Sequence, residues 1–236
     1  SLWGGSIRFT TPMLFALAWI TMFGIGGLTG LPLGLSTPDI HLHDTYYVIG
    51  HFHYVVAPGT IFAIFAGIYY WFPKITGRML SEKLGRLNFW TMLIGFNLTF
   101  MPMHVVGLNG MPRRVYTYES VMGWDFSNMV ATFGSYVIAV GMIVFVWNII
   151  RSQRKGEIAP ADPWDGRTLE WAIPSPPPVY NFKEIPVVHS RDAFWDQKYT
   201  VDAEGRAVAI PRGASTDSSG EEHDDGHGIH MPGMSY

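Results

Sequence analysis

Residues 43–53 read His-Asp-Thr-Tyr-Tyr-Val-Ile-Gly-His-Phe-His, and they open a long uncharged run. That run, Thr45–Pro73, has no Lys, Arg, Asp or Glu and exceeds the roughly 20 residues with which a helix crosses a bilayer. Ionisable side chains at membrane depth are costly, so they usually face a partner, a cofactor or a water-filled path. The stretch therefore predicts a membrane helix that carries polar chemistry at its start.

His51 and His53 are two residues apart, which on an α-helix separates their side chains by roughly 200°. The two imidazoles then point to opposite faces and cannot share one mononuclear metal. Their spacing favours two separate metal centres, one on each side of the helix. Neutral imidazole is a good axial ligand for haem iron, and haem is apolar enough to lie between membrane helices. The alternative is a pair of polar residues that are only hydrogen-bonded inside a helix bundle.

Three more stretches lack Lys, Arg, Asp and Glu over a membrane-spanning length: Phe9–Pro38, Leu87–Pro112 and Phe126–Ile150. A soluble core helix of this length would normally show a polar stripe, and these stretches do not. We therefore predict an all-α integral membrane fold with four transmembrane helices in residues 1–150, followed by a mostly irregular polar tail in residues 151–236. Four glycines of the first stretch predict a close approach between helices: Gly24, Gly26, Gly27 and Gly30.

Charge is distributed unevenly along the chain. Up to Ile150 there are 7 Lys and Arg against 5 Asp and Glu, and from Arg151 onward the counts are 9 and 14. With alternating topology, eight basic residues share one side of the membrane: Arg8, Lys74, Arg78, Lys83, Arg86, Arg151, Arg154 and Lys155. The positive-inside rule predicts that this side and the tail that follows it are cytoplasmic, with the His43–Asp44 loop outside.

Composition also excludes several classes of function. The chain has no cysteine, so it has no disulfide framework, thiolate zinc site, iron–sulfur cluster or thiol nucleophile. Its formal net charge is −3, and no strongly basic surface points to nucleic acid. The sequence begins at Ser1 rather than Met, in the middle of a pattern, which predicts a fragment or a naturally split polypeptide.

His43 and Asp44 are adjacent and lie just before the predicted helix, at the outer edge of the membrane. Imidazole nitrogen and carboxylate oxygen together suit a hard divalent ion that keeps several waters, such as magnesium or manganese. Two ligands do not close a metal site, so the others must come from water or another chain. The alternative is an ordinary helix start, where Asp44 interacts with free backbone amides.

Arg113 and Arg114 follow the third predicted span on the same outer side, against the positive-inside rule. Their position there predicts that an anion holds them. Haem carries two propionates, which adjacent arginines can neutralise through charge-assisted hydrogen bonds. Asp39 lies near the same surface and is expected to join this network. The alternative is two interfacial arginines that contact lipid headgroups.

The tail contains no further membrane span. Residues 173–180 read Ile-Pro-Ser-Pro-Pro-Pro-Val-Tyr, a stiff extended segment that we expect to lie along a partner. The end, Thr216–Tyr236, has almost no apolar residues and is predicted to be disordered. Its His223, His227 and His230 could bind a metal ion, but a solvated tail is the favoured interpretation.

The stretch His43–Val55 closely resembles the signature of subunit I of haem–copper oxygen reductases, specifically the A-type cytochrome c oxidases. Other segments resemble the same family in the expected order: Trp3–Arg8, Gly26–Gly30, Asn97–Phe100, Gly110–Arg114, Thr168–Trp171 and Ser175–Pro178. The last two are similar to the C-terminus of bacterial versions. The resemblance covers residues 1–183.

This resemblance implies roles for the two histidines of the helix. His51 would be the catalytic proximal ligand of the high-spin haem that binds oxygen, and His53 would be one of two axial ligands of the low-spin haem. Both haems would be of the A type. Copper of the complete site would not be ligated by this chain, because His104 is alone on another helix and His41 lies in the outer loop. Alone, the chain should not reduce oxygen.

The resemblance also implies roles for the residues of the outer side. His43 and Asp44 would hold magnesium near the contact with subunit II, and Arg113 and Arg114 would bind haem propionates. The family's subunit I has about twelve spans, of which this chain resembles the last four. Implied partners are therefore the N-terminal remainder of subunit I, subunit II with its copper centre, subunit III, cytochrome c and lipid of a bacterial inner membrane.

In the complete enzyme, electrons would pass from cytochrome c through the copper of subunit II to the low-spin haem and then to the haem–copper site. Oxygen would be reduced there to water while protons move outward. A quinol oxidase of the same superfamily is the first alternative, and the His43–Asp44 pair favours cytochrome c as donor. A second alternative is a non-enzymatic membrane scaffold or metal transporter that uses the same histidines and Asp44 as an ion path.

Overall fold

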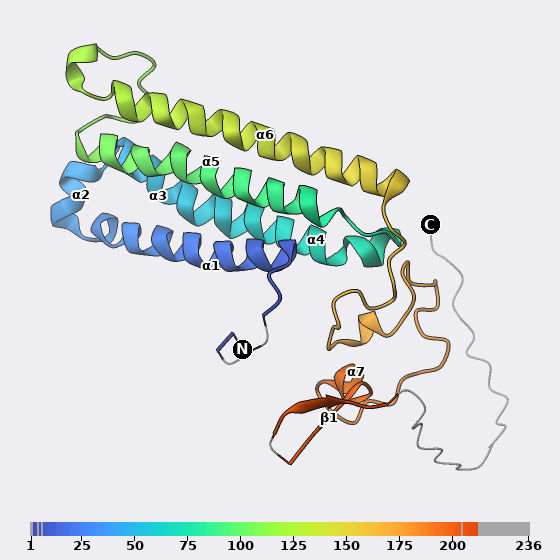
Figure 1. The fold of residues 1–236 in the computed structure, drawn as a ribbon. Helices are drawn as coiled ribbons and strands as arrows, with labels where there is room; N and C mark the ends of the chain where they lie inside the picture. Colours follow the sequence, from blue (N-terminus) through green and yellow to red (C-terminus); the bar gives the residue numbers. More distant parts are fainter. Residues whose placement is uncertain (1, 4, 6, 204, 212–236) are drawn as a thin grey trace, which may run out of the picture.

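The computed structural model describes residues 2, 3, 5, 7–203 and 205–211. These residues form a bundle of long antiparallel helices, with a smaller irregular region near one end (Figure 1). Four stretches are helical, long and apolar enough to cross a membrane: Thr11–Gly34, Tyr46–Thr76, Glu82–Leu108 and Asp125–Lys155. The predicted all-α membrane fold with four spans is thereby confirmed. The segment Thr216–Tyr236, with His223, His227 and His230, lies outside the described residues.

The bundle contains the elements that precede the irregular region. They are α1 (Thr11–Gly30), η1 (Pro32–Gly34), α2 (Ser36–Leu42), α3 (Tyr46–Ala57), η2 (Pro58–Phe62), α4 (Ala63–Thr76), α5 (Glu82–Leu108), η3 (Ser120–Met122) and α6 (Asp125–Lys155). The irregular region holds η4 (Leu169–Trp171), α7 (Ala193–Asp196) and the antiparallel pair β1 (Tyr199–Val201) and β2 (Ala207–Ala209). Because α1 and α5 begin where α4 and α6 end, the eight basic residues flanking the spans gather at one end, called the basic end below.

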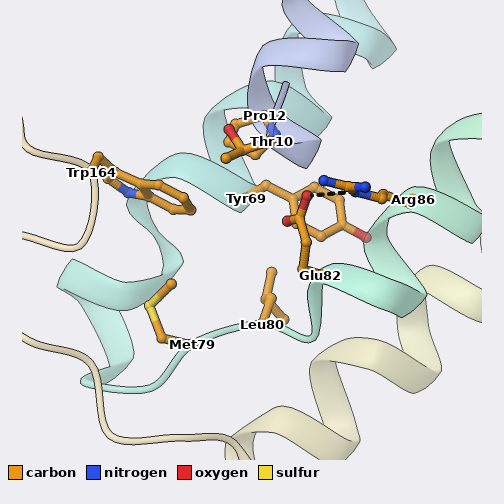
Figure 2. A pocket seen from close by; sticks show the side chains of 8 residues that line it. All are labelled: Thr10, Pro12, Tyr69, Met79, Leu80, Glu82, Arg86 and Trp164. Carbon is orange, nitrogen blue, oxygen red and sulfur yellow. Dashed lines mark hydrogen bonds and ion pairs between the residues drawn. The ribbon is translucent and has the colours of Figure 1, made fainter. Parts of the chain in front are cut away.

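At the basic end, the start of α1 is fastened to the start of α5. Pro12 occupies the first turn of α1, where a missing N–H costs no helical hydrogen bond. The Glu82 carboxylate accepts from the Thr11 backbone nitrogen at 2.9 Å and from the Thr11 hydroxyl at 3.0 Å. Figure 2 shows the Glu82 carboxylate paired with Arg86, whose Nε donates to it at 3.1 Å, and both side chains line a cavity of about 220 Å³. The carboxylate thus satisfies a free amide of α1 and holds two spans in register.

The second span changes its helical geometry partway along. Pro58 has no N–H to donate, and from this residue a π-helical turn runs to Phe62 before α4 begins. The turn starts five residues after His53. Short π turns inside α-helices are frequent at functional sites, so its position beside the histidines marks this part of the span as specialised.

Among the described glycines, the tightest approach to a neighbouring backbone is that of Gly107 in α5 to α3. A Cβ atom placed on Gly107 would overlap the backbone nitrogen of Tyr47 and lie 2.6 Å from its Cα atom. Beyond the helix ends, the Tyr46 nitrogen donates to the Met111 oxygen at 2.9 Å, and the Arg113 nitrogen donates to the Asp44 oxygen at 2.8 Å. The start of α3 is therefore held directly against the end of α5.

The interior is largely aromatic. The fully buried Phe15 ring lies 5.2 Å from the Phe89 ring and 5.0 Å from the Phe65 ring, so it joins three helices. Two buried amides cross-link helix backbones: Asn88 donates to the Gly141 oxygen at 2.9 Å, and Asn148 donates to the Ser81 oxygen at 3.1 Å. Such polar contacts hold helices together where lipid provides no hydrophobic driving force.

The predicted close approach at the glycines of α1 is confirmed at two positions. A Cβ on Gly26 would lie 2.9 Å from the Tyr54 backbone carbon, and a Cβ on Gly30 would lie 2.8 Å from the His51 Cε1 atom. Gly24 and Gly27 have no described atom within 4 Å of such a Cβ. Only one edge of the glycine stripe therefore faces a neighbouring helix in the described chain.

Residues after α6 pack against the end of α4. Trp171 is 0% exposed and donates from Nε1 to the Tyr70 hydroxyl at 3.0 Å. The Lys74 ammonium is buried and donates to the Ile173 oxygen at 2.7 Å and the Ala161 oxygen at 3.0 Å. This part of the tail is thus irregular in backbone but tightly held.

Further along the tail, Lys198 joins the hairpin region to the preceding loop. Its Nζ donates to Asp162 at 2.8 Å and to Asp165 at 2.8 Å, and the Tyr199 hydroxyl donates to Asp165 at 2.7 Å. Partial burial alone would raise the pKa of the Asp165 carboxyl, but the hydrogen bonds from Lys198 and Tyr199 outweigh it and hold this pKa below its usual value. Burial would likewise lower the pKa of Lys198, but its bonds to Asp162 and Asp165 raise it.

Replacing Gly107 by alanine tests the contact between α3 and α5. The added methyl group must push the two backbones apart, and such overpacking costs about 1–3 kcal/mol. We expect a lower thermal midpoint for the detergent-solubilised protein. Gly27→Ala is the matched control, because its methyl group meets open space. Equal midpoints for the two variants would contradict this packing.

The Lys198–Asp165 ion pair defines the pH range over which the pair β1 and β2, called the hairpin region, stays held against the loop that contains Asp165. The lowered pKa of Asp165 stabilises the folded state at pH values above the ordinary Asp pKa, and this stabilisation is lost as the pH falls through the pKa of the folded state. The raised pKa of Lys198 stabilises the folded state at pH values below the ordinary Lys pKa, and this stabilisation is lost as the pH rises through the pKa of the folded state. We expect protease resistance of residues 196–209 to be constant between about pH 5 and 9. At neutral pH, Asp165→Asn should be cleaved about fivefold faster, since this ion pair, whose side chains are 22% and 28% exposed, contributes about 1 kcal/mol.

Glu184→Gln is the control for this cleavage measurement, because it also removes a carboxylate charge but at an exposed position. If Asp165→Asn and Glu184→Gln are cleaved at the same rate, the ion pair does not hold the hairpin region.

Candidate functional site

His51 faces α1. Its Nδ1 atom lies 3.2 Å from the Thr29 hydroxyl oxygen, and that hydroxyl donates its own proton to the Gly26 oxygen at 3.0 Å. The hydroxyl oxygen therefore accepts a hydrogen bond from Nδ1–H of a neutral imidazole. Gly30 makes room for the ring, since a Cβ there would lie 2.8 Å from the His51 Cε1 atom.

His53 faces α5. Its Nδ1 atom lies 2.7 Å from the Ile49 backbone oxygen, to which it donates. Its ring stacks on Phe100 of α5, with ring centroids 4.1 Å apart and planes inclined by 13°. The two imidazoles of α3 therefore contact different helices, α1 and α5.

The hydrogen bonds leave the same atom free on both rings. With Nδ1 as the donor, a neutral ring carries its lone pair on Nε2, and Nε2 of neither His51 nor His53 has a hydrogen-bond partner in the part of the chain that the structure describes. A neutral imidazole whose Nδ1–H is held by an oxygen is the usual form of a metal-ligating histidine. The donor chemistry and the slot at Gly30 fit axial ligation of two haems.

His43 and Asp44 form a separate group at the opposite end of the bundle from the basic end. The His43 Nε2 atom lies 3.6 Å from an Asp44 carboxylate oxygen, and both side chains are more than half exposed. Asp44 has a φ of 58°, in the left-handed region, and its carboxylate is ion-paired with Arg113. Among the described residues no group of three His, Cys, Asp or Glu is placed to hold a metal ion, so this pair forms at most part of a metal site.

The arginines differ in their surroundings. Arg113 has its counter-ion in Asp44, an ion pair that the sequence analysis did not predict. Arg114 is exposed, has a φ of 70° and makes no ion pair with a described residue. Asp39 lies in α2 at the same end, where its backbone oxygen accepts from the His43 nitrogen at 2.7 Å. His51 lies five residues into α3 from Tyr46, roughly 7.5 Å of helix rise, so an anionic group on a ligand of His51 could reach these charges.

Three side chains around the histidines were missed by sequence reasoning. Thr29 and Phe100 hold the imidazoles of α3, and His104 is buried against the same helix with its Nδ1 atom 3.1 Å from the Phe100 oxygen. The sequence carried only a weak signal for them, the spacing of Phe100 and His104 on one face of α5. Neither of the two cavities described for the chain, the one of Figure 2 and an apolar groove between α5 and α6, includes these residues.

Comparison with known proteins gives a consistent result. The sequence profile of the family described as "Cytochrome C and Quinol oxidase polypeptide I" matches residues 1–137. Cytochrome c oxidase subunit 1 of Bacillus sp. (strain PS3) is 47% identical over 237 residues, which cover 100% of this chain and 36% of that protein. Cytochrome c oxidase subunit 1 of Thermostichus vulcanus is 52% identical over 188 residues, covering 80% and 34%. Quinol oxidase subunit 1 of Bacillus subtilis (strain 168) is 46% identical over 202 residues, covering 84% and 31%.

The chain spans about a third of the length of these curated relatives. Among solved structures, a chain of a heme-copper terminal oxidase dimer, determined by cryo-electron microscopy, has a similar fold with a TM-score of 0.56 and 24% sequence identity. That similarity covers 63% of this chain and 27% of the other. At this identity it supports the fold alone.

Replacing Thr29 by valine tests the support of His51. The variant keeps the side-chain shape but removes the acceptor of Nδ1–H, so the imidazole is less fixed and its Nε2 less basic. Loss of such a partner weakens binding at the ligating atom by about tenfold or more. We expect reduced haem retention in the complete protein, measured by a pyridine haemochrome assay after dilution. Thr21→Val is the control, because the Thr21 hydroxyl contacts only Leu17 of its own helix. Equal haem retention in both variants would exclude this role.

Proposed function

Since the chain belongs to the cytochrome c and quinol oxidase polypeptide I family, we propose that it forms the last four membrane helices of subunit I of a cytochrome c oxidase. The observation that carries this proposal is the geometry of α3. His51 and His53 face different helices. In each ring Nδ1–H donates a hydrogen bond to an oxygen, and Nε2 has no hydrogen-bond partner among the described residues. One helix can in this way ligate two haems and hold them at a short, fixed separation.

His51 is the axial ligand of the high-spin haem in this proposal and the catalytic residue of this chain. Its Nε2 would hold the iron, while the Thr29 hydroxyl beside Nδ1 would fix the tautomer and increase the basicity of the ring. His53 is one axial ligand of the low-spin haem, with Ile49 and Phe100 fixing the orientation of its ring. The haems, of the A type, and the copper of the complete site supply the electron transfer and the reduction of oxygen to water.

The charged residues near the start of α3 would compensate the negative charge of the haem propionates. Arg114 has no described ion pair and can bind a propionate directly. Arg113 is held by Asp44, so a propionate would share this arginine with the carboxylate. Asp39 on α2 completes the charged surface around them. Together these residues would orient the propionate edges of the haems toward the outer side.

His43 and Asp44 contribute two ligands to a magnesium or manganese ion whose remaining ligands come from water and subunit II. Copper is ligated by the N-terminal remainder of subunit I and not by this chain. In the described residues His41 lies in α2 and His104 in α5, and neither joins a cluster of metal-ligating side chains.

The membrane setting follows from the charge distribution. The basic end of the bundle lies on the cytoplasmic side of a bacterial inner membrane, together with the tail in residues 151–236. The remainder of subunit I, subunits II and III, cytochrome c and membrane lipid are the partners. Proton translocation belongs to the complete complex.

A quinol oxidase is the second candidate, because quinol oxidase subunit 1 of Bacillus subtilis is 46% identical to this chain. The His43–Asp44 pair favours cytochrome c, since it offers ligands for a metal ion beside a copper-bearing subunit. A metal transporter is disfavoured, because imidazoles that face different helices make a poor single-file path.

Oxygen uptake by the complete complex that contains this chain distinguishes the two donors. We expect fast uptake with reduced cytochrome c and slow uptake with a reduced quinol under the same conditions. Fast uptake with quinol alone would favour the quinol oxidase. A pyridine haemochrome assay on the same preparation should show two haems, and a preparation without haem would exclude both oxidases.

A further inference from the structure

His104 is a buried histidine that the proposed function does not use. Its side chain lies in α5 and the residue is 6% exposed. Nδ1 donates to the Phe100 oxygen at 3.1 Å, which leaves Nε2 as the acceptor of a neutral ring. Among the described side chains, only His104 Nε2 and the Ser175 hydroxyl are buried polar atoms without a hydrogen-bond partner. A buried polar atom without a partner carries a free-energy cost, so packing rather than a hydrogen bond at Nε2 must hold this ring in place.

The ring of His104 packs directly on the backbone of α3. A Cβ atom on Gly50 would lie 2.6 Å from Nδ1 and 2.7 Å from Cε1 of this imidazole. Two tyrosines of α3 border it edge to face, Tyr47 at a centroid distance of 5.0 Å and Tyr54 at 5.5 Å. Tyr47, Gly50 and Tyr54 recur at helical spacing on one face of α3, so the His104 ring fills a slot in that face.

The slot lies immediately beside the iron ligand. Gly50 precedes His51, whose side chain is turned by about 100° from the Gly50 position. The His104 ring therefore presses on the backbone of α3 one residue before the point where the His51 side chain leaves it toward Thr29. The three heavy atoms nearest to a Cβ at Gly50 all belong to the His104 ring, at 2.6, 2.7 and 3.1 Å.

We propose that His104 is a positioning residue for His51: its ring is the spacer between α3 and α5 that directs the His51 imidazole toward α1. This inference rests on the proposed function, because it concerns the ligand of the high-spin haem. This role depends on the volume and flat shape of the ring and does not require the unpaired Nε2 atom.

The test compares variants of the complete, haem-loaded complex. The readout is the iron–histidine stretching band in the resonance Raman spectrum of the reduced high-spin haem, which responds to the orientation of the proximal imidazole. His104→Ala removes the spacer, and Gly50→Ala forces it away. We expect both to shift the band and to lower turnover about tenfold or more, as misplacement of a reacting group by a fraction of an ångström to 1 Å does.

The conservative variant His104→Phe keeps a flat ring on Gly50 and should retain both the band and turnover. In the double variant Gly50→Ala with His104→Ala, the new methyl group occupies space left by the ring. The band of the double variant should therefore lie closer to that of the unmodified protein than the band of Gly50→Ala does. Gly24→Ala and Val105→Ala are the matched controls, since Gly24 has open space beside it and Val105 is half-exposed on the same helix.

An unchanged band in both His104→Ala and Gly50→Ala would overturn the proposal. A shifted band in His104→Phe, equal to that in His104→Ala, would also overturn it, because the nitrogens rather than the ring volume would then act. If His104→Ala does not assemble, Gly50→Ala and His104→Phe decide alone. Absence of a high-spin haem from the unmodified complex would instead reject the proposed function, so the two failures are distinguishable.

Discussion

The contact between the backbones of α3 and α5 is the constraint on which the rest of the site depends. Gly107 lets the two helices touch at Tyr47, and the hydrogen bonds between residues 44–46 and 111–113 continue this contact beyond the helix ends. In a bilayer, apolar side chains gain little by facing one another, so close backbone packing and polar cross-links fix the helices. Once α3 is fixed in rotation, the directions of both imidazoles and the pairing of Asp44 with Arg113 follow.

Features set by the membrane and by helix periodicity could be predicted from the sequence. A bilayer forbids charges over a defined length, so the four spans appear as uncharged runs whose ends lie within a few residues of the helices. That His51 and His53 contact different helices agrees with their separation on a helix of 3.6 residues per turn. The close contacts at Gly26 and Gly30 also agree with the glycine pattern, because small residues mark helix interfaces.

Features that depend on how helices rotate against one another could not be predicted. Nothing in the sequence pairs Thr29 with His51 or Phe100 with His53, because each contact joins two spans whose relative rotation the pattern leaves open. His104 looked isolated for the same reason. In the tail, the low apolar content concealed a large anchor, Trp171, which is fully buried although it belongs only to the three-residue 3-10 helix η4.

The wide turn at Pro58–Phe62 has a consequence for how the second span joins its neighbours. A π turn holds about one residue more than an α turn, so everything that follows is offset by roughly 100° from an uninterrupted screw. The directions of the side chains of α3, which carries the histidines, are thus offset from those of α4, which places Phe65 and Tyr69 in the core. The second span can therefore place the aromatic rings of α4 in the packed interior while α3 directs its two imidazoles at angles, relative to those rings, that an unbroken α-helix would not allow.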